Sequence, residues 1–209
     1  LDWKKNSLMS DLDKKEFCPV REGGKRKLFE YALVLSIKLK KGEYADFVRA
    51  ITPLIVDLLE LSLKVYCGEK LNNYTYIDKN GVQKWDAKKL KGTEVEKILL
   101  AEWRPFNYGV VYSTHLEHII KSKSRDGDVI KCADRLVNNV EKNVRNLAAH
   151  EIVSITDESI REKTGMTSED IMKNIQTLCE KLHINSKSEN WYSYEEMNEY
   201  ICKCIDEDE

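Results

Sequence analysis

The sequence predicts an all-α fold with one small β-hairpin insertion, and two observations support this prediction. Apolar residues recur at the three- and four-residue spacing of helices through most of the 209-residue chain. Between residues 71 and 86 the pattern changes to β-forming residues on both sides of Asn80-Gly81. Hydrophobic residues make up 42% and charged residues 33% of the chain, a balance typical of soluble, mostly helical proteins.

The N-terminal part is expected to hold two helices. Residues 1–24 are polar and are predicted to be a linker or leading segment, and one helical domain is expected over residues 25–209. The first helix is predicted over 25–41. A second, strongly apolar helix is predicted over 43–66 as a buried central helix, with Pro53 expected to kink or reset it.

Residues 71–86 are expected to form the hairpin, because an Asn-Gly pair between β-forming residues is the strongest short-range hairpin signal. Three aromatic residues, Tyr74, Tyr76 and Trp85, flank the predicted turn. Such rings can stack on nucleic-acid bases, but they also serve as cross-strand partners within a hairpin. The sequence leaves both interpretations open and favours the second.

Five further helices are predicted after the hairpin, separated by turn-forming residues. Thr167 or Ser168 is expected to cap one of them. The last is expected to begin with a capping box made by Ser193 and Glu196. The predicted helices cover residues 93–103, 110–121, 128–153, 168–183 and 194–205.

The composition indicates a cytoplasmic protein. None of the six cysteines forms a C-x-x-C pair, and most lie beside aliphatic residues, as reduced cysteines that act as small apolar residues do. No apolar run approaches the roughly 20 residues that span a membrane, and no signal-peptide pattern opens the chain. Because the chain starts at Leu1 rather than at methionine, we expect it to be a piece of a longer protein.

The net charge of −2 conceals an uneven distribution. Residues 1–50 and 121–150 have an excess of Lys and Arg, whereas residues 151–209 have 15 Asp or Glu against six Lys or Arg. Local positive charge attracts phosphate groups even when the whole chain is acidic. A solvated helix face explains the same counts, so the charge is compatible with RNA binding without requiring it.

The most informative motif is Arg145-Asn146-Leu147-Ala148-Ala149-His150, within the helix predicted over 128–153. Asn146 and His150 are four residues apart and therefore share one helix face. They lie away from an apolar stripe that is expected to face the core. That stripe consists of Val137, Val140, Val144, Leu147 and Ala148.

An arginine and a histidine on one exposed face can cleave RNA without a metal. A base takes the proton from the ribose 2′-OH, a cation stabilises the negative charge at phosphorus, and an acid protonates the departing 5′-oxygen. Histidine titrates near neutrality, and arginine presents a fixed fork of donors to phosphate oxygens. Because one helix supplies one of each residue, a two-fold dimer would be needed to supply two of each.

A different class of function fits the same residues. The chain could be a helical dimerisation module whose Arg145 and His150 form interface hydrogen bonds and bind nucleotides without cleaving them. Cleavage of single-stranded RNA in the presence of EDTA separates the two hypotheses.

Two sequence features resemble a known family. The Arg145-Asn146-x-x-x-His150 spacing resembles the R-x(4–6)-H signature of HEPN ribonucleases. The stretch Lys40-Lys41-Gly42-Glu43-Tyr44-Ala45-Asp46-Phe47-Val48-Arg49, followed by Pro53-Leu54, resembles the HEPN domain of the ancillary ribonucleases of type III CRISPR systems.

The resemblance implies a HEPN-type helical domain that works as a homodimeric, metal-independent endoribonuclease on single-stranded RNA, in type III CRISPR antiviral defence. Arg145 and His150 would then be catalytic, and Asn146 would position the phosphate or the histidine. No metal or other cofactor is expected. The family also implies an N-terminal CARF domain that binds a cyclic oligoadenylate activator, and we expect that domain to be missing from this chain.

Two further residue pairs are weaker candidates. His115 and His118 are three residues apart on a predicted helix, a spacing that can hold zinc, but no third ligand follows at a suitable spacing, so surface or packing histidines are favoured. Asp46 and Arg49 lie one helical turn apart. They are expected to form a local ion pair or to brace a neighbouring helix, with a supporting role in catalysis as the alternative.

Overall fold

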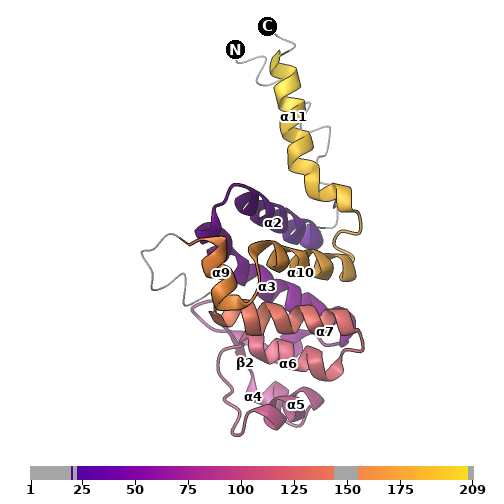
Figure 1. Cartoon of the computed structure of the whole chain (residues 1–209). Helices are drawn as coiled ribbons and strands as arrows, with labels where there is room; N and C mark the ends of the chain where they lie inside the picture. Colours follow the sequence, from indigo (N-terminus) through magenta and orange to yellow (C-terminus); the bar gives the residue numbers. More distant parts are fainter. Residues whose placement is uncertain (1–19, 21–22, 144–154, 207–209) are drawn as a thin grey trace.

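The computed structural model describes residue 20, residues 23–143 and residues 155–206. Within these residues the chain is mostly helical, and the single sheet is a two-stranded hairpin. The predicted all-α fold with a small hairpin insertion is therefore confirmed (Figure 1).

Helices α2 (Gly23–Lys40) and α3 (Tyr44–Tyr66) are joined by a short turn. The turn bends at Gly42, whose φ of +69° lies in the left-handed region that glycine adopts without a steric cost. Helix α3 runs through the middle of the bundle, as predicted, and most of its apolar residues are buried. Pro53 lies on its exposed side and does not interrupt the helix.

The hairpin pairs β1 (Thr75–Ile77) with β2 (Gln83–Trp85) in antiparallel register, with Thr75 opposite Trp85 and Ile77 opposite Gln83. A 3-10 turn, η1 (Leu71–Asn73), precedes it, and a short helix that the sequence did not predict, α4 (Ala87–Leu90), follows it. The hairpin is thus confirmed, with strands of three residues each.

The hairpin turn is longer than a two-residue Asn-Gly turn. The Gly81 N–H donates to the Asp78 carbonyl at 2.9 Å, and Gly81 has a φ of +76°. Among the described non-glycine residues only His183 has a positive φ. Asn80 therefore does not take part in a type I′ turn, which needs positive φ at both central residues. Asp78 organises the loop instead, because its Oδ1 accepts hydrogen bonds from the N–H groups of Asn80 (2.9 Å) and Val82 (3.0 Å).

Two helices follow the hairpin region, α5 (Glu94–Glu102) and α6 (Ser113–Lys123). Helix α6 begins three residues later than predicted, because the preceding residues pair with the hairpin instead. Val110 forms an isolated antiparallel bridge with Lys84, and the Val111 N–H donates to the Gln83 carbonyl at 3.0 Å.

Helix α7 (Gly127–Asp134) continues directly into a π-helical segment, η2 (Arg135–Glu141), and the chain stays helical to Asn143. The long helix predicted over 128–153 is therefore confirmed as far as Asn143. Its last ten residues lie outside the described part of the chain.

The C-terminal part contains α9 (Asp157–Thr164), α10 (Ser168–Lys181), η3 (Ser188–Tyr192) and α11 (Ser193–Asp206). The sequence did not predict α9. Helix α10 is capped by Thr167, whose Oγ1 accepts a hydrogen bond from the Asp170 N–H at 3.1 Å, as predicted. It ends two residues before the predicted His183, which adopts a positive φ of 53°.

The capping box predicted at Ser193 and Glu196 is wrong. Ser193 is the first residue of α11 and follows the 3-10 turn η3 directly, so it does not occupy the cap position. Its hydroxyl is buried and has no hydrogen-bond partner among the described residues.

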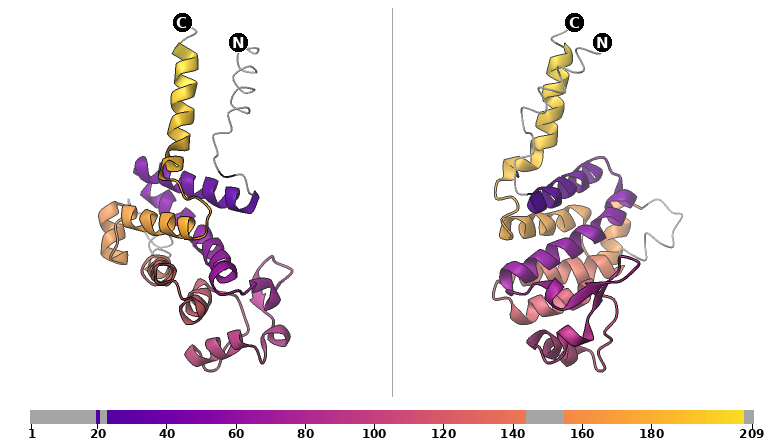
Figure 2. Two further views of the ribbon diagram at one scale, coloured as in Figure 1. Left: turned by 90° about the vertical axis from the view of Figure 1, so that its right-hand side faces the viewer. Right: turned by 180° about the vertical axis from the view of Figure 1, so that it is seen from behind.

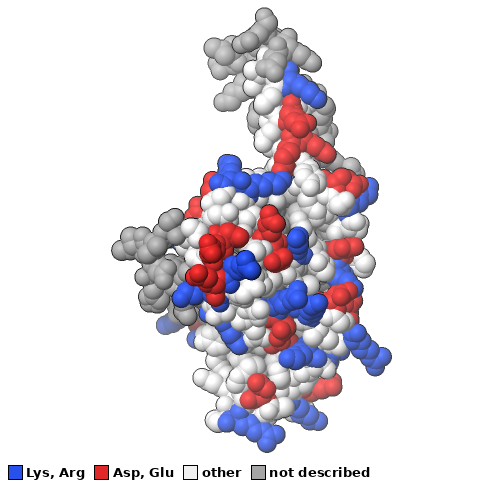
Figure 3. Space-filling view, viewed as in Figure 1, with Lys and Arg blue, Asp and Glu red and all other residues white. Residues whose placement is uncertain are grey.

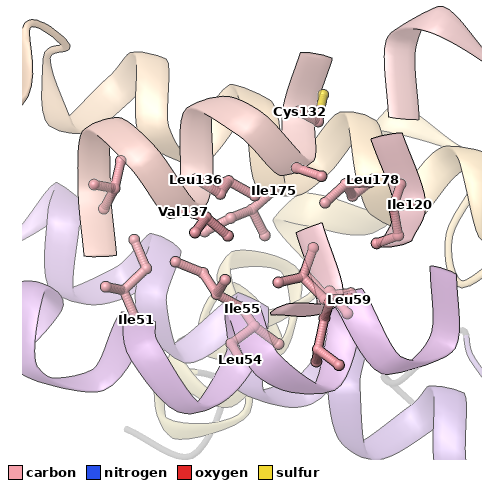
Figure 4. Packing of buried hydrophobic residues seen from close by; sticks show 14 of the residues in the cluster. Ile51, Leu54, Ile55, Leu59, Ile120, Cys132, Leu136, Val137, Ile175 and Leu178 are labelled. Atoms are coloured by element: carbon pink, nitrogen blue, oxygen red, sulfur yellow. The ribbon is translucent and has the colours of Figure 1, made fainter. Parts of the chain in front are cut away.

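The hydrophobic core joins α3 to the C-terminal helices (Figure 4). Ile51, Leu54, Ile55 and Leu59 of α3 lie opposite residues from η2 and α10. Val137 and Val140 are both fully buried, so this part of the predicted apolar stripe is confirmed; Val144, Leu147 and Ala148 lie outside the described residues. The residues that face α3 in Figure 4 include Leu136, Val137, Ile175 and Leu178.

Helix α11 projects from one end of the bundle (Figures 1 and 2). Near the base of α11, Lys40 of α2 forms an ion pair with Glu195 and lies 5.0 Å from the centre of the Tyr192 ring of η3. Nearby, the Trp191 and Phe29 rings pack with their centres 4.9 Å apart. None of the described helices is long and apolar enough to cross a membrane.

The packing predicts a large effect of truncation at Leu136, which is fully buried in η2. Leu136→Ala should lower the free energy of unfolding by about 2–5 kcal/mol, because the helix loses core contacts and leaves a cavity. Val65→Ala is the matched control, since Val65 is 47% exposed, and it should change stability by no more than about 0.5 kcal/mol. Urea unfolding of both variants measures this, and equal effects would show that η2 is not anchored in the core.

Candidate active site

The three predicted catalytic residues, Arg145, Asn146 and His150, lie outside the described residues. The structure describes the helix that leads to them, up to Asn143, and the chain that follows from Ile155. The candidate site is therefore built from the elements on either side of the motif.

The helix that leads to the motif has a clear start and a buried side. Asp126 caps it, because its Oδ1 accepts hydrogen bonds from the N–H groups of Asp128 (2.9 Å) and Val129 (3.1 Å). The buried side consists of Val129, Cys132, Ala133, Leu136, Val137 and Val140. This side packs against α3, α6 and α10, so the opposite side of the helix faces outward.

The π-helical segment changes the geometry of this outward side. The Lys142 N–H reaches back five residues to the Val137 carbonyl, instead of four as in an α-helix. This wider turn brings residues four or five apart closer to one line along the helix. Segments of π-helix inside α-helices are frequent at functional sites, and this one ends four residues before Arg145.

Two polar files run along the outward side. The first file is Asp134, Asn138 and Lys142, which are four residues apart and joined by hydrogen bonds. The Asn138 amide donates to Asp134 Oδ1 at 2.8 Å, and Lys142 Nζ donates to Asn138 Oδ1 at 2.6 Å. In the sequence the same four-residue spacing continues to Asn146 and His150.

The second file is Arg135, Asn139 and Asn143, one position further along the chain. The Asn143 amide donates to the Asn139 carbonyl at 2.7 Å, which fixes that side chain against the helix. Arg135 is exposed, and no described residue forms an ion pair with it. Its charge acts at longer range on Asp170, whose pKa is lowered by hydrogen bonds from Thr167 and further by Lys173 and Arg135.

Two buried carboxyl groups lie beside the first file. Glu117 of α6 is only 7% exposed, and within the described part of the chain its Oε1 has no hydrogen-bond partner. Burial raises the pKa of Glu117, and Asp134 raises it further, while Lys121, His118 and Lys142 oppose the shift. Glu141, the last residue of η2, is 2% exposed. Ionisable groups thus gather where the described helix approaches the motif.

The ion pair expected between Asp46 and Arg49 is present. Arg49 Nη1 lies 3.5 Å from Asp46 Oδ1, and Lys38 Nζ lies 3.6 Å from Asp46 Oδ2. Because all three side chains are partly exposed, we assign this pair to local bracing of the α2–α3 turn.

His115 is a packing residue. Its Nδ1 accepts hydrogen bonds from Trp85 Nε1 at 3.0 Å and from the Tyr112 N–H at 3.2 Å, so the nitrogen that a metal would use there is occupied. The ring of His118 packs edge-on against Trp103, with centres 5.2 Å apart. Within the described ranges, no group of three or more potential metal ligands occurs.

The structure separates the three aromatic residues of the hairpin into structural residues and one that could stack on bases. Trp85 is buried and lies opposite Thr75, and the Tyr74 hydroxyl donates to Glu69, so both are structural. Tyr76 lies opposite Lys84 and is 46% exposed, so only this ring is available for stacking.

The sequence and the fold are both similar to known proteins. Residues 17–202 match the family described as Cas_Csm6 HEPN domain. The chain is 26% identical over 149 residues to the CRISPR system endoribonuclease Csm6 of Mycobacterium tuberculosis (strain ATCC 25618 / H37Rv), a match that covers 70% of this chain and 34% of that protein. The chain thus spans about a third of the length of this relative.

The fold is similar to that of Enterococcus italicus Csm6 bound to cyclic hexa-2′-fluoro-hexa-dAMP, with a TM-score of 0.69. The match covers 95% of this chain and 48% of that chain, at 13% sequence identity. At this identity the likeness concerns the fold alone, and it confirms the predicted HEPN-type architecture.

The burial of His115 predicts a pH-dependent loss of stability. Burial lowers the pKa of His115 to about 4, from an ordinary value of 6.5. Below pH 6.5 the unfolded chain therefore binds a proton that the folded chain excludes, and stability falls as the pH decreases toward 4. At pH 5 this contribution amounts to a loss of about 2 kcal/mol.

Urea unfolding of the wild type and of His115→Gln at pH 7, 6 and 5 measures this contribution. The variant should lose less stability than the wild type between pH 7 and pH 5. His118→Gln is the control and should follow the wild type. A pH dependence that is identical in all three proteins would show that His115 does not titrate as its burial predicts.

Proposed function

This chain belongs to the Csm6 HEPN domain family, and we propose that it is a metal-independent endoribonuclease domain that cleaves single-stranded RNA in type III CRISPR antiviral defence. The name of the Mycobacterium tuberculosis relative, an endoribonuclease, supports this activity. Because this chain spans about a third of that relative, the activity of the whole protein is part of the proposal.

The polar face of the α7–η2 helix is the observation on which the proposal depends. Its inner side is buried in the core, and its outer side presents the hydrogen-bonded file of Asp134, Asn138 and Lys142. Because the spacing continues to Asn146 and His150 in the sequence, these two residues would extend a polar face if the helix continues with the same period.

In the proposed reaction, His150 of one copy removes the proton from the ribose 2′-OH, and the 2′-oxygen attacks the adjacent phosphorus. The bond from phosphorus to the 5′-oxygen then breaks, and a second histidine delivers a proton to that oxygen. Arg145 stabilises the negative charge on the phosphoryl oxygens during the step, and Asn146 positions the phosphate or the histidine. The products are a 2′,3′-cyclic phosphate on the 5′ fragment and a free 5′-hydroxyl on the other fragment.

The second histidine would come from a second copy of the chain. A two-fold axis through a shared cleft would place one Arg145 and one His150 on each side of the phosphate. We therefore propose that the active form is a homodimer located in the cytoplasm. A cyclic oligoadenylate activator would bind at the CARF domain, elsewhere in the longer protein, and not to this chain.

Removal of the proposed acid–base group tests the activity. The wild type should cleave labelled single-stranded RNA in EDTA, and His150→Ala should reduce the rate by about 10²–10⁴-fold, the usual contribution of general acid–base catalysis. His183→Ala is the matched control, because His183 is exposed at the end of α10, and it should cleave at the wild-type rate.

The fragments distinguish the outcomes further. Fragments that end in a 2′,3′-cyclic phosphate support attack by the 2′-OH. Retained cleavage in His150→Ala would reject the assignment of that residue. No cleavage by the wild type at high concentration would favour the alternative, a helical module that dimerises and binds nucleotides without cutting them.

A composite site also predicts the mass of the protein in solution. Sedimentation at micromolar concentration should give twice the chain mass of 24.3 kDa. A strict monomer under these conditions would contradict a site shared by two copies.

A further inference from the structure

We propose that the groove along α10, formed with η2 at one end and with residues 185–191 at the other, binds the single-stranded RNA beside the half-site. Arg135, Lys173 and Lys187 contact phosphates in this proposal, and Trp191 stacks on a base. This inference rests on the proposed function and names the residues that hold the substrate outside the catalytic motif.

The groove begins as a cavity of about 440 Å³ between the end of the motif helix and α10. Arg135 and Asn139 of the second polar file line one wall, and Lys173, Asn174 and Thr177 of α10 line the other. This volume is at the lower end of the range for small-molecule sites, so it suits a short single-stranded segment rather than a duplex.

A second hollow of about 520 Å³ continues from the first along α10. The two hollows share Lys173 and Thr177 in their linings, so they lie side by side along α10, and together they are called the groove. The second hollow is also lined by Lys187 and ends at Trp191, which is only partly buried. Cations spaced along a groove with an aromatic ring at one end are the elements with which proteins hold single-stranded RNA.

The cations of the groove are not neutralised by ion pairs. Neither Arg135, Lys173 nor Lys187 forms an ion pair with any residue in the described ranges. By comparison, Lys181, about two turns after Lys173 on α10, is bound by Asp126 and Asp128 at 3.1 and 2.7 Å. Hydrogen bonds from Thr167 lower the pKa of Asp170 in the first hollow, and the charges of Lys173 and Arg135 lower it further. A phosphate would therefore compete with Asp170 for two cations that no ion pair holds.

Two carboxylates also line the groove, and they limit its charge. Asp170 is engaged at the start of α10, where its Oδ2 accepts a hydrogen bond from Thr167 Oγ1 at 2.8 Å; Glu180 lies exposed in the second hollow. Three cations against two carboxylates leave a small positive excess. Figure 3 likewise shows Lys and Arg interspersed with Asp and Glu on this side of the molecule. RNA binding here would therefore depend on a few individual cations and not on a broad positively charged surface.

The groove lies next to the proposed half-site along the chain. Its wall residue Asn139 contacts Asn143 through a hydrogen bond, and Asn143 is two residues before Arg145. The lining of the first hollow also includes Gly165 and Met166, which form the turn after α9. Helix α9 is the first helix after the motif segment. RNA held in the groove would therefore enter between the two elements that the motif segment connects.

Binding of a 2′-O-methyl RNA oligonucleotide tests the groove without cleavage, because a methylated 2′-oxygen cannot attack phosphorus. Fluorescence anisotropy at several salt concentrations gives both the affinity and its salt dependence. Arg135→Gln and Lys173→Gln should each weaken binding about five- to tenfold, and each should reduce the slope of log K against log salt by about 0.7. Arg125→Gln and Lys97→Gln are matched controls, exposed and outside the groove, and should bind like the wild type.

Trp191 gives an independent readout. Trp191→Ala should weaken binding about tenfold and leave the salt slope unchanged, because stacking releases no counterions. Since Trp191 also packs on Phe29, Trp191→Phe is the second variant; it keeps an aromatic ring and should restore most of the affinity.

The outcomes separate this inference from the proposed function. If the wild type cleaves RNA but all groove variants bind like the wild type, the groove assignment is wrong and the catalytic assignment stands. If the groove variants weaken binding while the wild type fails to cleave, the groove is supported and the nuclease activity is rejected. A wild type that binds no RNA would overturn both.

Discussion

The attachment of the α7–η2 helix to the core is the constraint on which the rest of the structure depends. Val129, Leu136, Val137 and Val140 are fully buried, and η2 packs against α3, with Leu136 and Val137 facing it. Each such side chain stabilises the fold by about 1.5–3 kcal/mol relative to an exposed one, so rotation of the helix about its axis would be strongly unfavourable. The polar files therefore face outward in a fixed direction before any ligand binds.

A face fixed in this way supplies only part of what RNA cleavage needs. The attacking and leaving oxygens lie on opposite sides of the phosphorus, so the base and the acid must approach from opposite sides. One helix cannot provide both, whereas two copies related by a two-fold axis can. Arg135 and Asn139 of the groove are held on the same helix. If the proposed function and the proposed groove are correct, substrate positioning and catalysis would depend on one rigid element.

The sequence predicted the helical architecture well where a strong periodic pattern was present, as in α3 and α10, and where turn chemistry was distinctive, as at the hairpin. It failed where local pairing competes with helix propensity. Val110 looks helical in sequence but pairs with Lys84, and Ser193 looks like a helix cap but follows a 3-10 turn.

The two polar files were missed although their four-residue spacing was visible, because the π-helical segment that aligns them leaves no signal in the residue pattern. The groove could not be predicted either, since it forms only when η2 and α10 pack side by side.

A mixing experiment tests most directly whether the motif is half of an active site. Wild-type chain is combined with increasing amounts of the Arg145→Ala/His150→Ala double variant at constant total concentration, with time for subunit exchange, and RNA cleavage is measured. If the site needs both copies, only wild-type homodimers are active, and the rate falls with the square of the wild-type fraction. A rate that falls in simple proportion to that fraction would show that each copy cleaves by itself and would contradict the composite site.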